Sequence, residues 1–520
     1  MVHWPLDEAQ WANLVGARPE MVILGNARVL LAEGEPFVRA VRELRERLGG
    51  RPLLWAPRVT LPHRLALLTY LGLDLLDSTE AEWRATEGTY FDLELGSSEP
   101  APEPSQRACG CTGCREAGAP DLLAHALALI EQERRAALGA VAAGHLRERV
   151  EARLGAEPLL AELLRYADGH LASLLEERTP VIASGVRTYV LRESHRRPEV
   201  RRYQQRFLTR YRSPPSKRVL LVVPCSKTKP YRNSRSHRRF RAAFEELPAA
   251  SLVHTVSVTS PLGVVPRELE DVPPARHYDI PVTGDWDEDE RRTVREALER
   301  LLVTGAYERA IVHLDPEEYS FLRPSIPESL RPVWTISDGR STSSASLAAL
   351  GEAVSAALDV SDRPKGRALA VVREELEAIA AFQFGREGAA NLFRAPVRLQ
   401  GRPWFQRLTD DKGVDLATWR DARGLFQLTV EGGRRIHAAG TLEVGVRDGV
   451  PLNGDLFVPG VREADPAIRI GDAVVLVRDG ELVAVGEAVL PGHLMVELEH
   501  GLAVSVRHRA RPAPGPPTST

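Results

Sequence analysis

The sequence predicts an α/β protein of several domains, and three observations support this class. The chain has 520 residues, which at roughly 100–200 residues per domain suggests three or four domains. Short apolar runs alternate with helical patterns at the start, and a second α/β unit begins with the buried strand KRVLLVVP. The last part consists of short alternating strands and turns, which is typical of a small β-barrel.

Residues 1–205 are predicted to form a truncated TIM-barrel-like domain. Its βα units begin with MVILGNARVLL and FVRAVRELRERLGG and continue through PLLWAP to DLLDS, where Asp77 would close a strand. Only about a hundred residues precede a cysteine cluster, whereas a complete barrel needs about 250 residues. The predicted barrel is therefore incomplete.

Three further domains are expected after this first one. Residues 206–360 are predicted to form a parallel-sheet α/β core, because LVHTVSVTS, RAIVHLD and PVWTIS resemble further buried strands. A small α+β domain (361–434) and a barrel-like domain (435–512) follow. In open α/β sheets, sites lie at the carboxyl ends of strands, where the segment PCSKTKPY falls.

Composition and charge restrict the class of protein. No apolar run of about 18 residues occurs, and the N-terminus lacks a signal-peptide pattern, so we expect a cytoplasmic protein without membrane contact. The formal net charge of −3 means that any RNA contact must come from local basic patches. The segment 192–212 is either such a patch, with interleaved aromatic residues, or a solvated helix.

The cluster CGCTGC predicts a zinc site. Cys109, Cys111 and Cys114 supply three thiolates, and His145 or His125 would complete a tetrahedral Cys₃His set. Four protein ligands leave no open position for water. The zinc ion would therefore be structural.

The remaining cysteine, Cys225, lies in PCSKTKPY together with Lys227 and Lys229, two of only five lysines in the chain. Neighbouring ammonium groups are expected to lower the pKa of the thiol and to favour the nucleophilic thiolate. The alternative is a small buried hydrophobic residue at the end of a sheet.

The N-terminal half resembles the C-terminal part of tRNA-guanine transglycosylases. The resemblance rests on DLLDS, EGTYF, the CxCxxC cluster and a later histidine that opens a helix. It makes His145, in GHLRERVEARL, the preferred fourth ligand and leaves His125 as the alternative. It also matches Asp77 to that family's nucleophile, with a helix-capping role as the alternative.

The segment VPCSKTKPYRNSRSH resembles archaeosine synthases more specifically. It fits the pattern PC-x3-KPY-x2-S-x2-H at Pro224, Cys225, Lys229, Pro230, Tyr231, Ser234 and His237. TSPLGVVPRELE, YDIPVTGDWDEDE and FQFGREGAANLF also resemble that family, and the terminal barrel resembles a PUA-type RNA-binding domain. The resemblance extends over nearly the whole chain, in order.

This resemblance implies the transfer of lysine onto the nitrile of 7-cyano-7-deazaguanine in tRNA, forming an amidine. Cys225 could form a thioimidate, with His237 or Tyr231 shuttling protons, and Lys229 could orient a phosphate or carboxylate. Ser234 belongs to the same expected catalytic loop. The candidate substrate-binding residues are Lys227, Arg267, Glu268 and Asp279, with Asp285 and Glu290 as further carboxylates; the alternative for each is a cap or a surface ion pair.

The expected partners are tRNA and free lysine, and a homodimer is left open. No GxGxxG or P-loop motif occurs, so no nucleotide cofactor is implied. Two other functions remain: base exchange through Asp77, and a non-catalytic subunit that presents tRNA to a partner enzyme.

Overall fold

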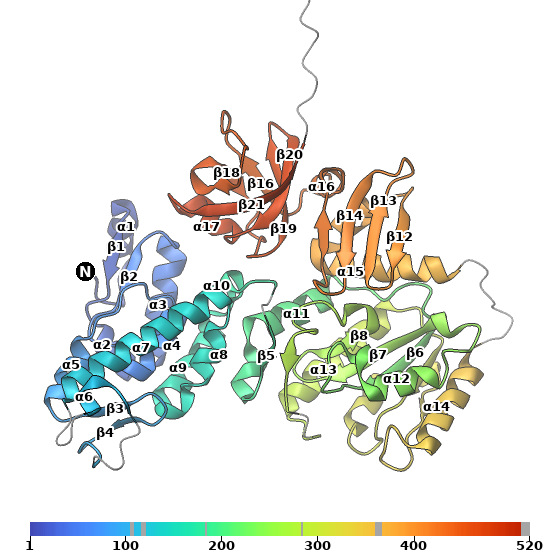
Figure 1. The fold of residues 1–520 in the computed structure, drawn as a ribbon, viewed down its shortest axis with the longest axis horizontal. Coiled ribbons are helices and arrows are strands. Elements are labelled where there is room, and N and C mark those ends of the chain that lie inside the picture. Colours follow the sequence, from blue (N-terminus) through green and yellow to red (C-terminus); the bar gives the residue numbers. More distant parts are fainter. Residues whose placement is uncertain (104–108, 116–120, 183–184, 282–283, 359–366, 511–520) are drawn as a thin grey trace, which may run out of the picture. The chain divides into compact units, whose positions relative to one another are not determined.

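The computed structural model describes the chain except residues 104–108, 116–120, 183–184, 282–283, 359–366 and 511–520. The chain divides into two compact units (Figure 1). The first comprises residues 1–179, 191–198 and 497–501, and the second comprises 180–190, 199–496 and 502–520. Within the described residues, no helix is long and apolar enough to cross a membrane.

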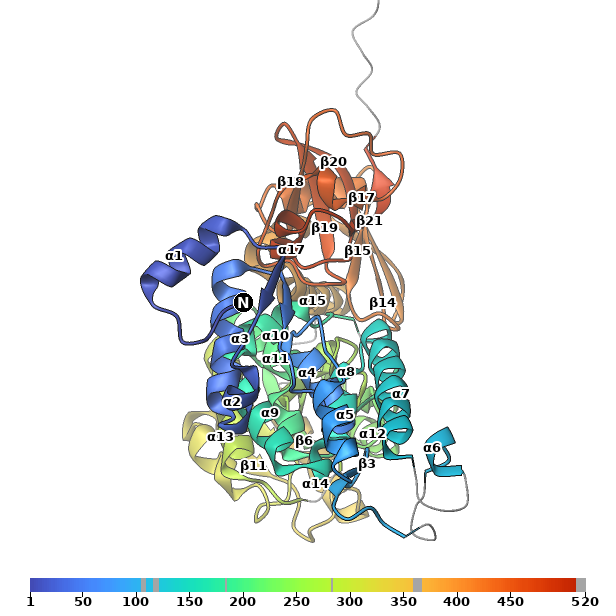
Figure 2. The same cartoon turned by 90° about the vertical axis from the view of Figure 1, so that its left-hand side faces the viewer.

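The first unit is mostly helical. Its apolar core includes the fully buried Phe37, Val41 and Leu71. Figure 2 shows its longest helix, α7, beside α4 and α5, against which it packs. The helices are α1 (Glu8–Ala17), α2 (Ala27–Ala32), α3 (Glu35–Leu48), α4 (Leu65–Leu71), α5 (Thr79–Thr86), α6 (Thr112–Arg115), α7 (Leu122–Ala143), α8 (Leu146–Glu151), α9 (Pro158–His170) and α10 (Ala172–Arg178).

The described strands of this unit do not close into a barrel. β1 (Met21–Ile23) and β2 (Leu53–Trp55) form a two-stranded parallel sheet, which isolated bridges extend at Val2–Leu24 and Trp55–Leu75. β3 (Tyr90–Asp92) and β4 (Gly96–Ser98) form a separate hairpin. The expected βα order is present, but three-residue strands leave most of the burial to helices, and the TIM-barrel-like arrangement is not confirmed.

The α/β core of the second unit contains a five-stranded sheet in the order β11-β10-β6-β7-β8. Its strands are β6 (Val219–Pro224), β7 (Val253–Thr259), β8 (Gly263–Pro266), β10 (Arg309–Val312) and β11 (Val333–Trp334). All pairs are parallel except β7–β8. The chain runs from β6 to β7 on one side and later returns to β10 on the other, so the strand order reverses beside β6.

Helices cover this sheet because its central strands are apolar on both faces. Alternate residues of β6, including Leu221, pack with Phe240 of α12 (Arg235–Ala242) and Leu350 of α14 (Ser344–Ala357). α13 (Glu288–Thr304) packs against β8. The burial of β6 on both faces explains its continuous run of Val and Leu, and β7, which is also buried, carries valines among His, Ser and Thr.

Two further sheets complete the second unit, together with β5 (Arg187–Thr188) paired to β9 (Tyr278–Asp279). The antiparallel sheet β12 (Arg398–Arg402), β13 (Phe405–Thr409), β14 (Asp415–Arg420) and β15 (Phe426–Leu428) packs against α16 (Val430–His437), which contacts α15 (Arg367–Leu392). The last sheet has the order β17-β21-β20-β19-β16-β18 and is nearly closed. Its strands are β16 (Glu443–Val446), β17 (Leu456–Phe457), β18 (Val461–Ala464), β19 (Ala473–Arg478), β20 (Glu481–Ala488) and β21 (Leu502–Arg509), with the short helix α17 (Gly492–Glu497).

The aromatic residues of the basic segment 192–212 are part of the core. Tyr203, Phe207 and Tyr211 of α11 (Pro198–Thr209) and the following turn are at most 1% exposed and stack on one another. In the first unit, the fully buried Arg197 pairs with Glu151. These aromatic rings are therefore not available to stack on RNA bases.

Candidate metal centre and strand-end site

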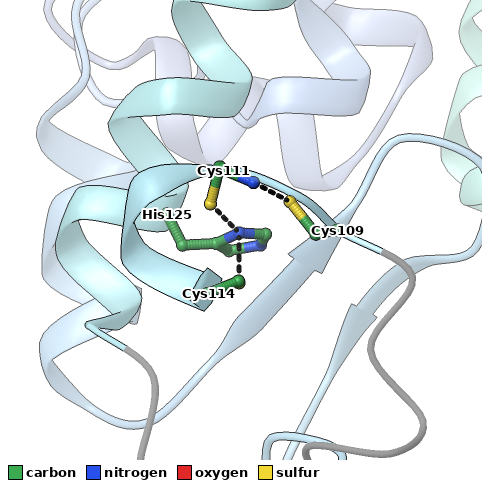
Figure 3. A group of neighbouring side chains, drawn as sticks. All are labelled: Cys109, Cys111, Cys114 and His125. Atoms are coloured by element: carbon green, nitrogen blue, oxygen red, sulfur yellow. Dashed lines mark hydrogen bonds between the residues drawn. The ribbon is translucent and has the colours of Figure 1, made fainter. Parts of the chain in front are cut away.

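Three thiols and one imidazole converge at the start of α7 (Figure 3). The ligand atoms of Cys109, Cys111, Cys114 and His125 lie within 4.8 Å of one another. His125 Nδ1 is 3.3 Å from the Sγ atoms of both Cys111 and Cys114. This Cys₃His group could hold a metal ion, and its donor types and number fit a closed tetrahedral site.

The surroundings prepare His125 Nδ1 for such a role. His125 Nε2 lies 2.7 Å from the carbonyl oxygen of Phe91, which places the ring proton on Nε2 and leaves the lone pair on Nδ1. Tyr90 stacks on the imidazole at 4.3 Å between ring centroids. Burial and the neighbouring thiols raise the pKa of Cys114 to about 12, so without a metal this thiol would stay protonated, and a metal would bind by displacing its proton.

The structure corrects the preferred fourth ligand from His145 to His125. His125 lies in the first turn of α7, whereas His145 lies just beyond its last residue, Ala143. A helix rises 1.5 Å per residue, so the two histidines are separated by about 30 Å. His145 instead approaches Glu148, with its Nδ1 atom 3.3 Å from the carboxylate.

Asp77 is fully engaged at the start of α5. Its carboxylate accepts hydrogen bonds from the indole of Trp55 at 3.1 Å and from the backbone N–H groups of Arg58 and Thr79 at 3.1 and 3.0 Å. These donors lower the pKa of Asp77 although burial opposes the shift. The arrangement fits the alternative that Asp77 stabilises a turn.

The sheet register places Cys225 beside the last residue of β7. Val222 of β6 pairs with Val256 of β7 and with Val312 of β10. The pairing of β6 with β7 continues to Pro224 and Val258, so the residues that follow are Cys225 and Thr259. The pairing of β6 with β10 ends at Val312, and the chain continues from there into a turn.

Cys225 directly follows β6, the strand beside which the strand order reverses. Its N–H donates to the carbonyl of Val258 at 3.1 Å, which fixes the first residue after β6. Its side chain is half-buried. Ligands of open α/β sheets bind at such reversals, because the connections leave a crevice there.

The prediction that the pKa of Cys225 is lowered is wrong. Burial raises the pKa of this thiol, and the nearby Glu318 carboxylate adds to the shift. A hydrogen bond with Thr259 and the charge of Lys229 act in the opposite direction but do not outweigh burial. Lys227 is exposed. Cys225 is therefore a thiol at rest and needs a base.

Lys229 lies close enough to Cys225 for the charge of each to affect the pKa of the other. Burial lowers the pKa of Lys229, while Cys225 and Asp279 partly restore it. Its Nζ atom lies 4.2 Å from the ring centroid of Tyr278, a cation–π contact that stabilises the protonated form. A lysine with a depressed pKa beside a thiol can act as a general base.

The other residues of the loop have supporting contacts. The Ser234 hydroxyl accepts the His237 N–H at 3.1 Å and caps α12. His237 donates from Nε2 to the Pro224 carbonyl at 2.9 Å, and burial together with Arg267 lowers its pKa to about 3. Tyr231 is buried and donates to Thr259 at 3.2 Å. These contacts hold the strand end in place, and proton transfer by His237 or Tyr231 stays a prediction.

The acidic candidates have separate positions. Glu268 is buried and accepts a hydrogen bond from Tyr211 at 2.6 Å, with His254 3.3 Å away. Its carboxylate is therefore already held by side chains of the core. The negative charge of Asp279 raises the pKa of Lys229, so Asp279 lies near the strand-end site. Of the remaining candidates, Arg267 forms an ion pair with Glu270 at 3.1 Å. Asp285 is exposed, and Glu290 belongs to the capping box of α13.

Sequence reasoning missed Thr259, Tyr278 and Glu318. Thr259 Oγ1 lies 2.5 Å from the hydroxyl of Tyr278, directly beside Cys225 in the register. The signal for Thr259 was available, since it ends a predicted buried strand with a hydroxyl. No local pattern marks Tyr278 or Glu318, because only the fold brings them to the thiol.

Comparisons with known proteins identify the family. The chain is 33% identical over 510 residues to the archaeosine synthase subunit alpha of Methanosarcina acetivorans, covering 94% of this chain and 80% of that protein. The chain belongs to the archaeosine synthase family. The archaeosine synthase of Haloferax volcanii is 34% identical, with 94% and 82% coverage. The resemblance of VPCSKTKPYRNSRSH to archaeosine synthases is confirmed.

Family models match three parts of this archaeosine synthase homologue. Residues 200–354 match a domain of unknown function (DUF5591), residues 374–441 match the patch-forming domain C2 of tRNA-guanine transglycosylase, and residues 446–510 match the PUA domain. The tRNA-guanine(15) transglycosylase of Methanothermobacter thermautotrophicus is 27% identical over 86% of this chain and 64% of that protein. The nearly closed last sheet is thus a PUA domain.

Proposed function

We propose that this chain is a tRNA-modifying transferase that joins the side-chain amine of free lysine to the nitrile of a 7-cyano-7-deazaguanine in tRNA. One observation carries the proposal: Cys225 lies at the strand reversal of the α/β core, with Lys229 beside it. A nitrile carbon is an electrophile suited to a sulfur nucleophile and needs a proton donor for its nitrogen. The names of the relatives, archaeosine synthases, agree with such a base modification.

The proposed first step uses Cys225 and Lys229. The sulfur of Cys225 forms a bond with the nitrile carbon while the thiol proton moves to the neutral amine of Lys229. The resulting ammonium gives a proton to the nitrile nitrogen, which yields a thioimidate. This order agrees with the directions of the two pKa shifts, because the thiol is protonated and the lysine is easily deprotonated.

The second step releases the enzyme. The amine of lysine attacks the thioimidate carbon, the carbon–sulfur bond breaks, and an amidine forms without any change of oxidation state. His237 and Ser234 act through the strand end, since their contacts are to backbone atoms and to each other. Base exchange is less well supported, because the Asp77 carboxylate accepts hydrogen bonds from Trp55, Arg58 and Thr79 that stabilise a turn.

Two other parts have supporting roles in this proposal. Zinc at the Cys₃His group would join α6 to α7 and hold the first unit together, with no reaction step at the metal. The PUA domain would bind tRNA away from the reacting base. The boundaries 1–205, 206–360, 361–434 and 435–512 remain predictions, as does a homodimer.

The proposal is tested with tRNA that carries the cyano base. Cys225→Ser should abolish the mass increase of this tRNA that lysine causes, while tRNA binding is unchanged. Lys229→Ala should slow the transfer by about 10²-fold or more, whereas Lys412→Ala, an exposed lysine between β13 and β14, serves as the control. Full activity of Cys225→Ser would refute the thiol mechanism.

A further inference from the structure

Glu318 lies in the turn that follows β10, the strand next to β6 on the side away from β7. The carboxylate of Asp315 accepts the backbone N–H groups of Glu317 and Glu318, each at 3.0 Å. The Tyr319 N–H donates to the carbonyl of Asp315 at 3.0 Å. β10 ends at Val312, which pairs with Val222 of β6, so this turn and Cys225 leave the sheet at the same edge, where the Glu318 charge acts on the thiol.

Two aromatic side chains hold the Glu318 carboxylate. The indole N–H of Trp286 donates to Oε1 at 3.4 Å, and the hydroxyl of Tyr319 also donates to this carboxylate. The rings of Trp286 and Tyr319 meet edge to face, with centroids 5.6 Å apart. Glu318 itself is exposed. An exposed glutamate normally samples many rotamers, so a carboxylate held in this way is pre-organised while remaining open to solvent.

The Glu318 carboxylate does not help the Cys225 thiol to ionise. Its negative charge opposes ionisation of Cys225, so Glu318 is not an activator of the nucleophile. The other reactant of the proposed transfer, however, is an alkylammonium ion at neutral pH. Such an ion requires a carboxylate both to hold it and to remove a proton before its nitrogen can attack. Glu268, expected from the sequence to serve an amine, is buried in the core instead.

We propose that Glu318 is the general base for the incoming amine. This inference rests on the proposed function. The ammonium donates a hydrogen bond to Glu318 and then transfers one proton to it. The freed nitrogen lone pair forms the bond to the thioimidate carbon, and the electrons of the carbon–sulfur bond leave with Cys225, whose sulfur takes up a second proton from the attacking nitrogen and becomes a thiol again. The amidine keeps the nitrile-derived nitrogen, and Glu318 releases its proton to water, to which it is exposed. Trp286 is a positioning residue, because it acts through Glu318.

The test compares Glu318→Gln with Glu317→Gln, the adjacent exposed glutamate, in the full-length chain. With lysine as the amine and cyano-base tRNA as the acceptor, Glu318→Gln should slow transfer by about 10²-fold or more, and Glu317→Gln should not slow it. Hydroxylamine is uncharged at neutral pH and needs no base. The two variants should therefore differ by no more than a few-fold with hydroxylamine. Trp286→Phe should slow lysine transfer by less than Glu318→Gln does.

Three results would overturn the inference. If Glu318→Gln transfers lysine as fast as Glu317→Gln, Glu318 has no role in the step. If it is equally slow with hydroxylamine and lysine, Glu318 serves the acceptor base or the fold and not the amine. A wild-type protein that transfers neither amine to this tRNA would overturn the proposed function, and this inference with it. The first two results would leave the proposed function intact.

Discussion

Replacing His125 by alanine should remove the metal from the Cys₃His group and destabilise the first unit. Changes that only affect outer contacts of metal ligands cost about 10–100-fold in affinity, so losing the ligand itself should cost at least about 10²-fold. With free metal in excess, each tenfold loss lowers the metal-linked stability by about 1.4 kcal/mol, or about 2.8 kcal/mol here. The Phe91 carbonyl, deprived of its donor 2.7 Å away, adds about 1–3 kcal/mol. The free energy of unfolding of the first unit should thus fall by about 4–6 kcal/mol.

His145→Ala is the matched control, because it removes a partly exposed histidine at the other end of the same helix. We expect a change within about 1 kcal/mol, as for other surface ion pairs. Metal content is measured by mass spectrometry of the purified proteins, and unfolding is followed in urea with and without a chelator. Chelation should reduce the deficit of His125→Ala to the hydrogen-bond contribution. The reasoning fails if His145→Ala loses the metal while His125→Ala keeps one ion per chain.

Three further predictions concern single contacts. Gly113→Ala should weaken metal retention, because its Cβ would lie 2.5 Å from the Asp121 carbonyl oxygen and force α6 away from α7; unchanged metal content would contradict this. Asp77→Asn should leave lysine transfer unchanged and lower the stability of the first unit by about 1 kcal/mol; loss of transfer with normal folding would instead support base exchange. Glu268 has a pKa lowered to about 2, because His254 and Tyr211 outweigh its burial, so its contribution is present above the ordinary value of 4.5 and is lost as pH falls toward 2. Glu268→Gln should therefore destabilise the protein at pH 7, by an amount on the order of 3 kcal/mol, and much less near pH 2; equal losses at both values would refute this.

Local patterns in the sequence were sufficient for the elements of the α/β core. KRVLLVVP contains an almost wholly apolar strand, and LVHTVSVTS contains the neighbouring strand, with a valine at three of its seven positions. Both faces of a parallel sheet are covered, so the requirement for burial is visible in each strand alone. The CxCxxC spacing likewise identified three of the four members of the Cys₃His group, since those thiols are close in sequence and must be close in space. The family resemblance followed from motifs that recur in order along the chain, and the relatives confirm it.

The extent of the N-terminal barrel was not predictable in the same way. A strand of three residues, such as Met21–Ile23, gives the same apolar signal whether it belongs to a closed barrel or to a two-stranded sheet. Closure depends on pairing between strands far apart in sequence. In the described part of the first unit, that pairing is limited to β1 with β2 and the hairpin β3–β4, together with isolated bridges.

What the sequence by itself determined is the set of reactive groups: three clustered thiols, two nearby histidines, and one isolated cysteine beside two lysines. Tertiary structure decided which of them act together. The length of α7 separates His145 from the thiols that His125 meets, because a helix converts sequence distance into about 1.5 Å per residue. Burial raises the pKa of Cys225, opposite to the predicted shift, because desolvation depends on all the surrounding atoms and not only on the residues next to it in the sequence. The register of β6 with β10 brought the turn that carries Glu318 to the thiol, from more than ninety residues away in the chain.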